Sequence, residues 1–243
     1  MPEIEIFPNA AALSRRAAEQ FSALAEFAIR KRERFAVALS GGSTPRAMHA
    51  LLAAPPFAAR IDWSKVYVFW SDERCVAPQD AESNYGNARA SLLIHVHIPP
   101  ENIQRVHGEL APEHAAQKYE DKLREFFAGK APRFDLVLLG LGEDGHTASL
   151  FPGAPGIREN SRWAVAVKHA VPPLPLVDRV TLTPPVINAA ANVTFLVTGA
   201  AKAERLRQVL RDPYNPDRLP AQVVRPKDGK LFWFLDEAAA GKI

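Results

Sequence analysis

The feature that most constrains this chain is a repeated alternation between helical and strand-like patterns. Apolar residues between positions 10 and 30 recur at helical intervals, and residues 34–40 then read as a short buried strand. We expect further helices over 43–53, 84–93, 112–128 and 200–210, and strands over 65–70, 133–140, 163–168, 178–183, 192–199 and 231–236. This alternation predicts an α/β fold in which helices cover both faces of a mainly parallel sheet.

The composition is that of a globular chain without membrane spans. Of the 243 residues, 47% are hydrophobic and 23% are charged. No apolar run approaches the roughly 20 residues that cross a bilayer, so no membrane association is expected. The net charge of +3 is scattered along the chain, and a nucleic-acid partner is not expected either. No repeat or Gly/Ser-rich linker divides the sequence, so we predict one domain over residues 1–243.

The first residues and the single cysteine indicate a compartment. The segment MPEIEIFPNA carries two glutamates and lacks the basic and apolar regions of a secretory signal. Cys75 has no second cysteine to pair with, which is typical of a reducing environment, and an ordinary free thiol is the simplest interpretation. A cytoplasmic location is therefore the expectation.

Parallel α/β sheets bind ligands beyond the carboxyl ends of their strands, so the residues after each expected strand are the functional candidates. Gly41, Gly42, Ser43 and Thr44 follow the strand over 34–40. The glycines allow close backbone approach, and the N–H groups and hydroxyls at a helix start can bind phosphate oxygens. We interpret the segment as an anion cradle. The alternative is a glycine turn with a Ser or Thr helix cap.

Charged residues follow the next expected strand. Asp72, Glu73 and Arg74 come soon after residues 65–70. Arginine suits bidentate binding of phosphate, and an adjacent carboxylate can hold it, bind a sugar hydroxyl or orient a base. A surface ion pair is the alternative. Asn84 and Tyr85, at the start of the following helix, could line the same cleft.

Two more basic residues stand near later strand ends. Arg179 leads the strand over 178–183, and Lys202 lies on the first turn of the helix over 200–210. Either side chain could bind a phosphate at the rim of a cleft. Plain surface charge is the alternative for both.

Residues 136–153 read LVLLGLGEDGHTASLFPG and contain the spacing G-x-G-x-x-G of a dinucleotide-binding loop. Two observations argue against a dinucleotide. The acidic pair within the loop, Glu143 and Asp144, would repel a pyrophosphate. The next expected strand ends in Lys168 and His169 instead of the acidic residue that binds a ribose. The glycines therefore indicate a tight turn at a strand end.

The histidine of that turn offers a different chemistry. Histidine has an unperturbed pKa of about 6.5, and a carboxylate such as Asp144 can set the tautomer of His146. We interpret His146 as a general base, with a helix-capping histidine as the alternative. No G-x-S-x-G elbow supplies a serine nucleophile, so the base would act on water. His95 and His97 lack the further ligands of a zinc site, and no metal is expected.

Taken in order, four segments resemble the 6-phosphogluconolactonase family over residues from about 35 to 211: LSGGSTP, WSDERCVAPQDAESNYG, FDLVLLGLGEDGHTASLFPG and RVTLTPPVINAAANVTFLVTGAAKAE. This family hydrolyses a sugar-phosphate lactone in the pentose phosphate pathway. The resemblance implies a three-layer Rossmann-like fold, shared with glucosamine-6-phosphate deaminases and ribose-5-phosphate isomerases. We further expect a small-molecule lactone as the ligand, no cofactor, and a monomer or homodimer.

The resemblance also implies roles for particular residues. It makes His146 the base, which we expect to deprotonate a water that attacks C1 of the lactone. Asp144 or Asp72 would orient the imidazole, and backbone N–H groups of the glycine turns would receive the oxyanion.

The phosphate end of the substrate would be anchored by other groups. The resemblance assigns Arg74 and Arg179 to the phosphate and makes the Gly-Gly-Ser-Thr loop, with Ser43 and Thr44, a substrate-binding turn. Lys202 is a further candidate. One departure concerns the loop before residue 179, where family members often carry a lysine and this chain reads KHAVPPLPLVDRV. Lys168 or His169 could replace that lysine.

Two alternatives remain at this point. A deaminase or isomerase of the same fold would resemble patterns with a tyrosine after Asp-Glu and an acid after the histidine, whereas this chain has Arg74 and HTASLFP. A non-catalytic sugar-phosphate sensor would normally carry a DNA-binding unit of about 50 residues ahead of the domain. Here the first 34 residues are accounted for by one helix and a lead-in.

Overall fold

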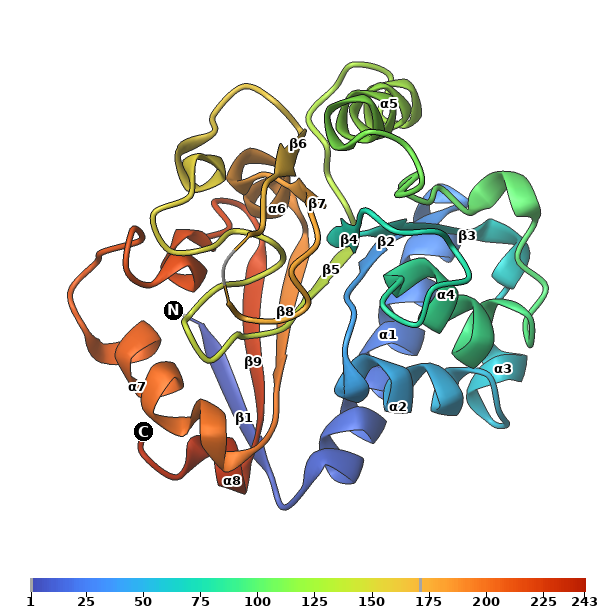
Figure 1. The fold of residues 1–243 in the computed structure, drawn as a ribbon. Helices are drawn as coiled ribbons and strands as arrows, with labels where there is room; N and C mark the ends of the chain where they lie inside the picture. The colour runs from blue at the N-terminus through green and yellow to red at the C-terminus, as the bar shows by residue number, and fades with distance from the viewer. Residues whose placement is uncertain (1, 171) are drawn as a thin grey trace.

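A six-stranded parallel sheet forms the centre of the computed structural model, which describes residues 2–170 and 172–243 (Figure 1). Every neighbouring pair in it is parallel, which confirms the predicted sheet type. In spatial order the strands are β1 (Glu3–Phe7), β9 (Lys230–Asp236), β8 (Asn192–Val197), β5 (Leu136–Leu139), β2 (Phe35–Leu39) and β3 (Val66–Trp70).

Helices cover both faces of this sheet, as predicted. Figure 1 shows α1 to α4 on one side and α6 and α7 on the other. The helices are α1 (Ala10–Arg32), α2 (Ser43–Leu52), α3 (Phe57–Arg60), α4 (Asn84–Ala88), α5 (Pro112–Phe126), α6 (Pro184–Ala189), α7 (Ala203–Arg211) and α8 (Glu237–Ala240). Among the described residues, no helix is long and apolar enough to cross a membrane.

The core divides into two apolar layers that share the same strands. Val37 and Leu39 of β2 belong to the layer under α1 and α2, whereas Ala36 and Ala38 face the layer on the other side. All of these side chains are buried. Burial on both faces explains why the strand is apolar at every position. Because one sheet supplies both layers, we propose that residues 1–243 form a single domain.

A second, smaller sheet corrects the expected arrangement of two strands. Residues 163–168 and 178–183 do contain strands, but β6 (Ala164–Val167) and β7 (Arg179–Leu182) join β4 (Asp72–Arg74) in an antiparallel sheet. The described residues of the link between β6 and β7 form no helix, which is the usual crossover between parallel neighbours. Ser71 connects the two sheets, since its N–H donates to Leu39 O at 2.8 Å and its carbonyl accepts from Leu182 N at 2.8 Å.

Two local features differ from the sequence prediction. The lead-in to the first helix contains β1, an edge strand paired with β9. Residues 3–6 alternate polar and apolar side chains, a short strand signal, and Ile4 and Ile6 remain 41% and 53% exposed. The single helix expected over 84–93 ends as α4 at Ala88 and continues as one π-helical turn, Arg89–Leu93.

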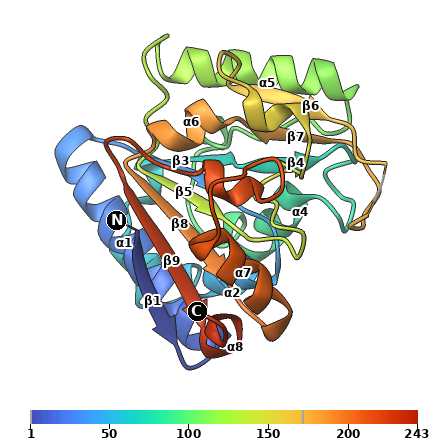
Figure 2. The same ribbon diagram turned by 90° about the vertical axis from the view of Figure 1, so that its left-hand side faces the viewer.

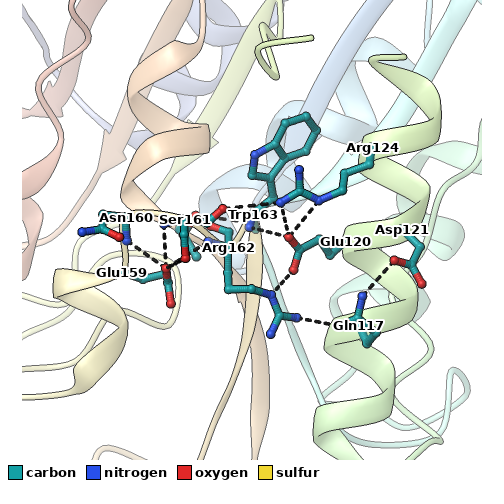
Figure 3. Close-up of polar contacts among 10 residues, drawn as sticks. Gln117, Glu120, Asp121, Arg124, Glu159, Asn160, Ser161, Arg162 and Trp163 are labelled. Carbon is teal, nitrogen blue, oxygen red and sulfur yellow. Dashed lines mark hydrogen bonds and ion pairs between the residues drawn. The ribbon is translucent and has the colours of Figure 1, made fainter. Parts of the chain in front are cut away.

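Helix α5 is fastened to the small sheet by a buried carboxylate, shown in Figure 3. Figure 2 shows α5 lying across β6 and β7. Glu120 has only 3% of its side chain exposed, yet its oxygens accept hydrogen bonds from Arg124 Nη2 at 2.6 Å and from Arg162 Nε. The backbone N–H of Trp163 donates to Glu120 Oε1 at 3.2 Å. The buried charge is therefore paired on two sides, which is the condition under which burial of an ion is tolerated.

Replacing Glu120 with alanine is expected to lower the free energy of unfolding by about 1.5 to 3 kcal/mol, because the hydrogen bonds from two arginines and from the Trp163 N–H are lost while the half-exposed arginines remain solvated. Urea unfolding followed by circular dichroism measures this change. The matched control is Glu125→Ala on the same helix, whose exposed pair with Lys122 should contribute about 0 to 1 kcal/mol. Equal losses for the two variants would contradict the structural role assigned to Glu120.

Candidate functional site

The candidate site lies where the strand order reverses. From β2 the chain passes to β3 on one side, and it then returns to β5 on the other side of β2. At this point the connections that follow neighbouring parallel strands run to opposite sides of the sheet. This leaves a crevice at the carboxyl ends of the strands, where ligands usually bind in such sheets. A cavity of about 290 Å³ lies there, and the predicted residues that line it come from all four segments: Gly41, Gly42, Asp72, Arg74, His146, Arg179 and Lys202.

Three of the predicted residues do not line this cavity. Asp144 lies behind His146 and contacts it directly. Ser43 is exposed outside the cavity, and Thr44 is buried, with its Oγ1 2.9 Å from Thr198 Oγ1. The glycines of the predicted cradle thus reach the cavity, whereas the two hydroxyls predicted to bind phosphate do not.

His146 and Asp144 form a hydrogen-bonded pair. Asp144 Oδ1 lies 2.6 Å from His146 Nδ1 and also accepts from the His146 backbone N–H at 3.0 Å. Burial acts to raise the pKa of Asp144, but the hydrogen bond and charge of His146 outweigh it and lower that pKa below its ordinary value. A carboxylate on Nδ1 leaves Nε2 as the nitrogen able to accept a proton.

The turn that carries this pair depends on glycine. Gly142 N–H donates to His146 O at 2.8 Å, and Gly145, with a φ of 91°, reverses the chain between them. A Cβ at Gly142 would lie 2.1 Å from His146 Nδ1 and 2.7 Å from Asp144 Oδ1. The turn and the side-chain pair can therefore coexist only if position 142 has no side chain.

We expect Gly142→Ala to lower kcat by about 10²-fold for the lactone hydrolysis that the sequence resemblance implies, because the methyl group displaces the His146 imidazole and a shift of about 1 Å can have that effect. Steady-state kinetics at saturating substrate measure this change. Gly241→Ala, at the end of α8 and outside the cavity, is the control, because its φ is −61° and a Cβ there would meet no atom closer than 3.6 Å. Gly241→Ala should therefore change kcat much less than Gly142→Ala. A Gly142→Ala variant as active as Gly241→Ala would contradict the expectation.

Asp72 has different partners from those expected for an orienting carboxylate. Its Oδ2 accepts from Ser149 Oγ at 2.6 Å, and its Oδ1 lies 3.3 Å from Asn84 Nδ2. Asp144 is the carboxylate that contacts His146. Asp72 is buried and lines the cavity. Ser149 has no motif of its own in the sequence, although its place three residues after His146 made it a neighbour of the site.

Arg74 and Arg179 face each other across β4 and β7. They are direct partners in the antiparallel register, where like charges repel. Burial, assisted by the charge of Arg74, lowers the pKa of Arg179, while the charge of Asp72 acts in the opposite direction. Within the described part of the chain, Nε of each arginine is buried without a hydrogen-bond partner. Two adjacent guanidinium groups with spare donors are suited to binding an anion in the cavity.

Each guanidinium is also held by backbone carbonyls. Arg74 Nη1 donates to Glu82 O at 2.9 Å and to Asn84 Oδ1, and Arg179 Nη2 donates to Pro175 O at 3.2 Å. Gly41 allows this arrangement, because a Cβ there would lie 1.9 Å from Asn84 Oδ1. Of the two residues predicted to line the cleft, Asn84 lies on the cavity wall and Tyr85 does not.

Glu73 supports the same loop from behind. Its buried carboxylate accepts from the backbone N–H groups of Arg74, Asn84 and Tyr85, each at 2.7 Å. Burial raises the pKa of Glu73 to about 7, although these three hydrogen bonds work in the other direction. Glu73 thus fixes the backbone from which two cavity residues project.

Comparison with known proteins now places the chain. Residues 8–233 match a family model described as glucosamine-6-phosphate isomerases/6-phosphogluconolactonase. The chain belongs to this family. A relative from Oryza sativa subsp. indica, named probable 6-phosphogluconolactonase 2, is 38% identical over 254 residues, which cover 99% of this chain and 90% of the relative.

Solved structures of similar proteins agree over the whole chain. A protein called devB is 38% identical, with a TM-score of 0.90 and complete coverage of both chains. The 6-phosphogluconolactonase from Trypanosoma cruzi is 31% identical, with a TM-score of 0.89, and the match covers 100% of this chain and 97% of that one. The likeness therefore extends to every element that builds the cavity.

Neither residue suggested as a replacement for the lysine often found in this family lines the cavity. Lys168 is exposed, and His169 is buried, with its Nε2 donating to the carbonyl of Pro173 at 2.6 Å. Lys202 does line the cavity, and its Nζ lies 3.5 Å from Glu143 Oε1. The third cation of the cavity thus comes from the 3₁₀ turn Ala200–Lys202 that follows β8.

Proposed function

We propose that this protein hydrolyses 6-phospho-D-glucono-1,5-lactone to 6-phospho-D-gluconate, the second step of the oxidative pentose phosphate pathway. The observation that carries the proposal is one cavity that joins the His146–Asp144 pair to the facing arginines Arg74 and Arg179. A base and an anion site match the two ends of a phosphorylated lactone. Relatives named 6-phosphogluconolactonase cover nearly the whole chain, which supports the same assignment.

In the proposed mechanism His146 Nε2 takes a proton from a water molecule. The resulting hydroxide oxygen bonds to C1, and the carbonyl electrons move onto the oxyanion, which we assign to the backbone N–H groups of Gly41 and Gly42 on the cavity wall. When the carbonyl re-forms, the bond between C1 and the ring oxygen breaks, and the imidazolium returns its proton to that oxygen. The new carboxylic acid then loses its proton to solvent. Asp144 keeps the imidazole in one tautomer throughout.

The phosphate supplies binding energy and position rather than chemistry. Arg74, Arg179 and Lys202 surround the cavity with positive charge, so the anionic end of the substrate binds there and brings C1 within reach of the base. Asp72, held by Ser149, offers a fixed acceptor for a sugar hydroxyl.

The test is hydrolysis of freshly generated 6-phosphogluconolactone, followed by NMR against the spontaneous rate. The same protein should act far more slowly on glucono-1,5-lactone, which lacks the phosphate. Release of ammonia from glucosamine 6-phosphate would instead favour a deaminase. Tight binding of the lactone without turnover would favour a sugar-phosphate sensor.

The remaining expectations concern the protein in the cell. We propose that it acts in the cytoplasm, as a monomer or homodimer, without a metal or cofactor and without a nucleic-acid partner. The scattered charge supports the proposal that no nucleic acid binds. Gel filtration with light scattering measures the oligomeric state.

A further inference from the structure

Phe151 lies among three groups of the candidate site. The centroid of its ring is 4.6 Å from that of the His146 imidazole. The Arg179 guanidinium carbon is 5.7 Å from the same ring centroid. On His169 the phenyl ring is stacked almost flat, with centroids 4.2 Å apart and an angle of 18° between the planes. One buried ring therefore contacts the proposed base, the proposed phosphate anchor and a second imidazole.

The loop after β5 is built to bring Phe151 back onto His146. Thr147 and Leu150 pair across a tight turn, in which Leu150 N–H donates to Thr147 O at 2.9 Å. Ala148 in this turn has a left-handed φ of 48°, which is uncommon for a residue with a side chain. Thr147 Oγ1 also donates to Gly140 O at 2.9 Å and ties the turn to the end of β5. The ring position is thus set by backbone geometry.

His169 is immobilised on the far side of the ring. Its backbone N–H donates to Asp178 Oδ1 at 3.0 Å, and its Nε2 donates to Pro173 O at 2.6 Å. With both ends of the residue bonded and only 4% of it exposed, the imidazole forms a rigid support behind Phe151. Asp178 directly precedes Arg179 at the start of β7. The residue that holds His169 is therefore next in sequence to the proposed phosphate anchor.

We propose that Phe151 is a positioning residue for the lactone hydrolysis, and that His169 is its fixed support. The proposal rests on the proposed function. The Phe151 ring, tilted by 45° against the imidazole, prevents His146 from turning away from Asp144, so Nε2 stays directed into the cavity. Because the same ring lies beside Arg179, the base and the phosphate anchor keep a constant separation while the substrate spans them. Such alignment acts on the rate of the chemical step more than on binding.

Phe151→Leu tests the proposal in steady-state kinetics. We expect kcat to fall about 10- to 100-fold, since the imidazole loses its aligned position. KM should rise by less than about threefold, because Arg179 keeps its own hydrogen bond to Pro175 O. Unchanged kcat, or a loss confined to KM, would overturn the proposal.

Two matched variants separate alignment from general packing. Phe127→Leu removes an equally buried ring that packs on Phe134 and Trp163, away from the cavity, so it should lower stability but leave kcat unchanged. His169→Phe keeps a ring stacked on Phe151, whereas His169→Leu does not, so the phenylalanine variant should retain the higher kcat. A kcat loss in Phe127→Leu as large as that in Phe151→Leu would reduce the effect to packing and overturn the proposal.

A measurement without turnover keeps this proposal separate from the proposed function. Nitrogen NMR of the His146 imidazole at alkaline pH should show a single tautomer, protonated on Nδ1, in the parent protein and in Phe127→Leu. Phe151→Leu should show a mixture of tautomers. If the parent protein fails to hydrolyse the lactone above the spontaneous rate, the proposed function fails, and the tautomer result still decides the role of Phe151. The same single tautomer in Phe151→Leu would overturn that role.

Discussion

His146→Ala is expected to lower kcat for 6-phosphogluconolactone about 10²- to 10⁴-fold, the range typical for loss of a general base. The structure gives the reason. His146 Nδ1 is occupied by Asp144, and the residue lines the cavity, so Nε2 is the nitrogen available to a water molecule there. KM should change little, because the arginines that bind the phosphate remain. Stopped-flow or NMR assays at saturating lactone measure the loss above the spontaneous rate.

The control for this variant is His114→Ala, which removes an exposed imidazole on α5 and should leave kcat unchanged. His146→Gln preserves the polarity and much of the volume of the side chain, so it should be nearly as inactive as the alanine variant. If His146→Ala retained kcat within a factor of about three of the parent, the assignment of the base would be wrong.

Arg179→Met should lower kcat/KM for the phosphorylated lactone by about 10- to 100-fold, since a charged hydrogen bond contributes about 1.5 to 3 kcal/mol. Methionine keeps most of the buried aliphatic volume at this position and removes the guanidinium. Its effect should disappear with glucono-1,5-lactone, which has no phosphate to bind. Inorganic phosphate should also inhibit the variant less strongly than the parent.

Arg179→Lys should restore only part of the lost activity, because a single ammonium group cannot reproduce the fork of the guanidinium. Arg158→Met is the control, since its exposed guanidinium pairs with Asp217 outside the cavity. An equal loss of kcat/KM on both lactones would mean that Arg179 supports the fold of the site and not the phosphate. Removing Arg74 as well should give less than the sum of the two single effects, because the arginines are neighbours that share one anion.

The fold was largely readable because its signals are local. In α1 the apolar residues recur at the helical period over 23 residues. In β2 the apolar residues are continuous, which is typical of a strand covered on both faces. For β1 the signal was short, since polar and apolar residues alternate only over residues 3–6. The antiparallel sheet of β4, β7 and β6 was missed as a separate unit because pairing partners are set by loop lengths and three-dimensional packing, and β4 is only three residues long.

The chemistry of the site was readable for a related reason. Glycine turns and charged residues at strand ends stand out against apolar strands, so Arg74, His146 and Arg179 could be found without coordinates. The contacts among them could not. Two carboxylates were possible partners for His146, and Phe151 in HTASLFPG resembled any other apolar residue until its ring was placed between two imidazoles.

Sequence alone was sufficient for the alternation of elements, the end of the sheet that carries the site, and the residue types available for catalysis, because each depends on neighbours within a few positions. Tertiary structure decided that Asp144 rather than Asp72 contacts His146, that Arg74 and Arg179 stand opposite each other, and that Ser43 and Thr44 lie outside the cavity. The Asp144 contact depends on the local geometry of the turn at Gly145, whereas the two arginines are about a hundred residues apart and only the pairing of β4 with β7 brings them together.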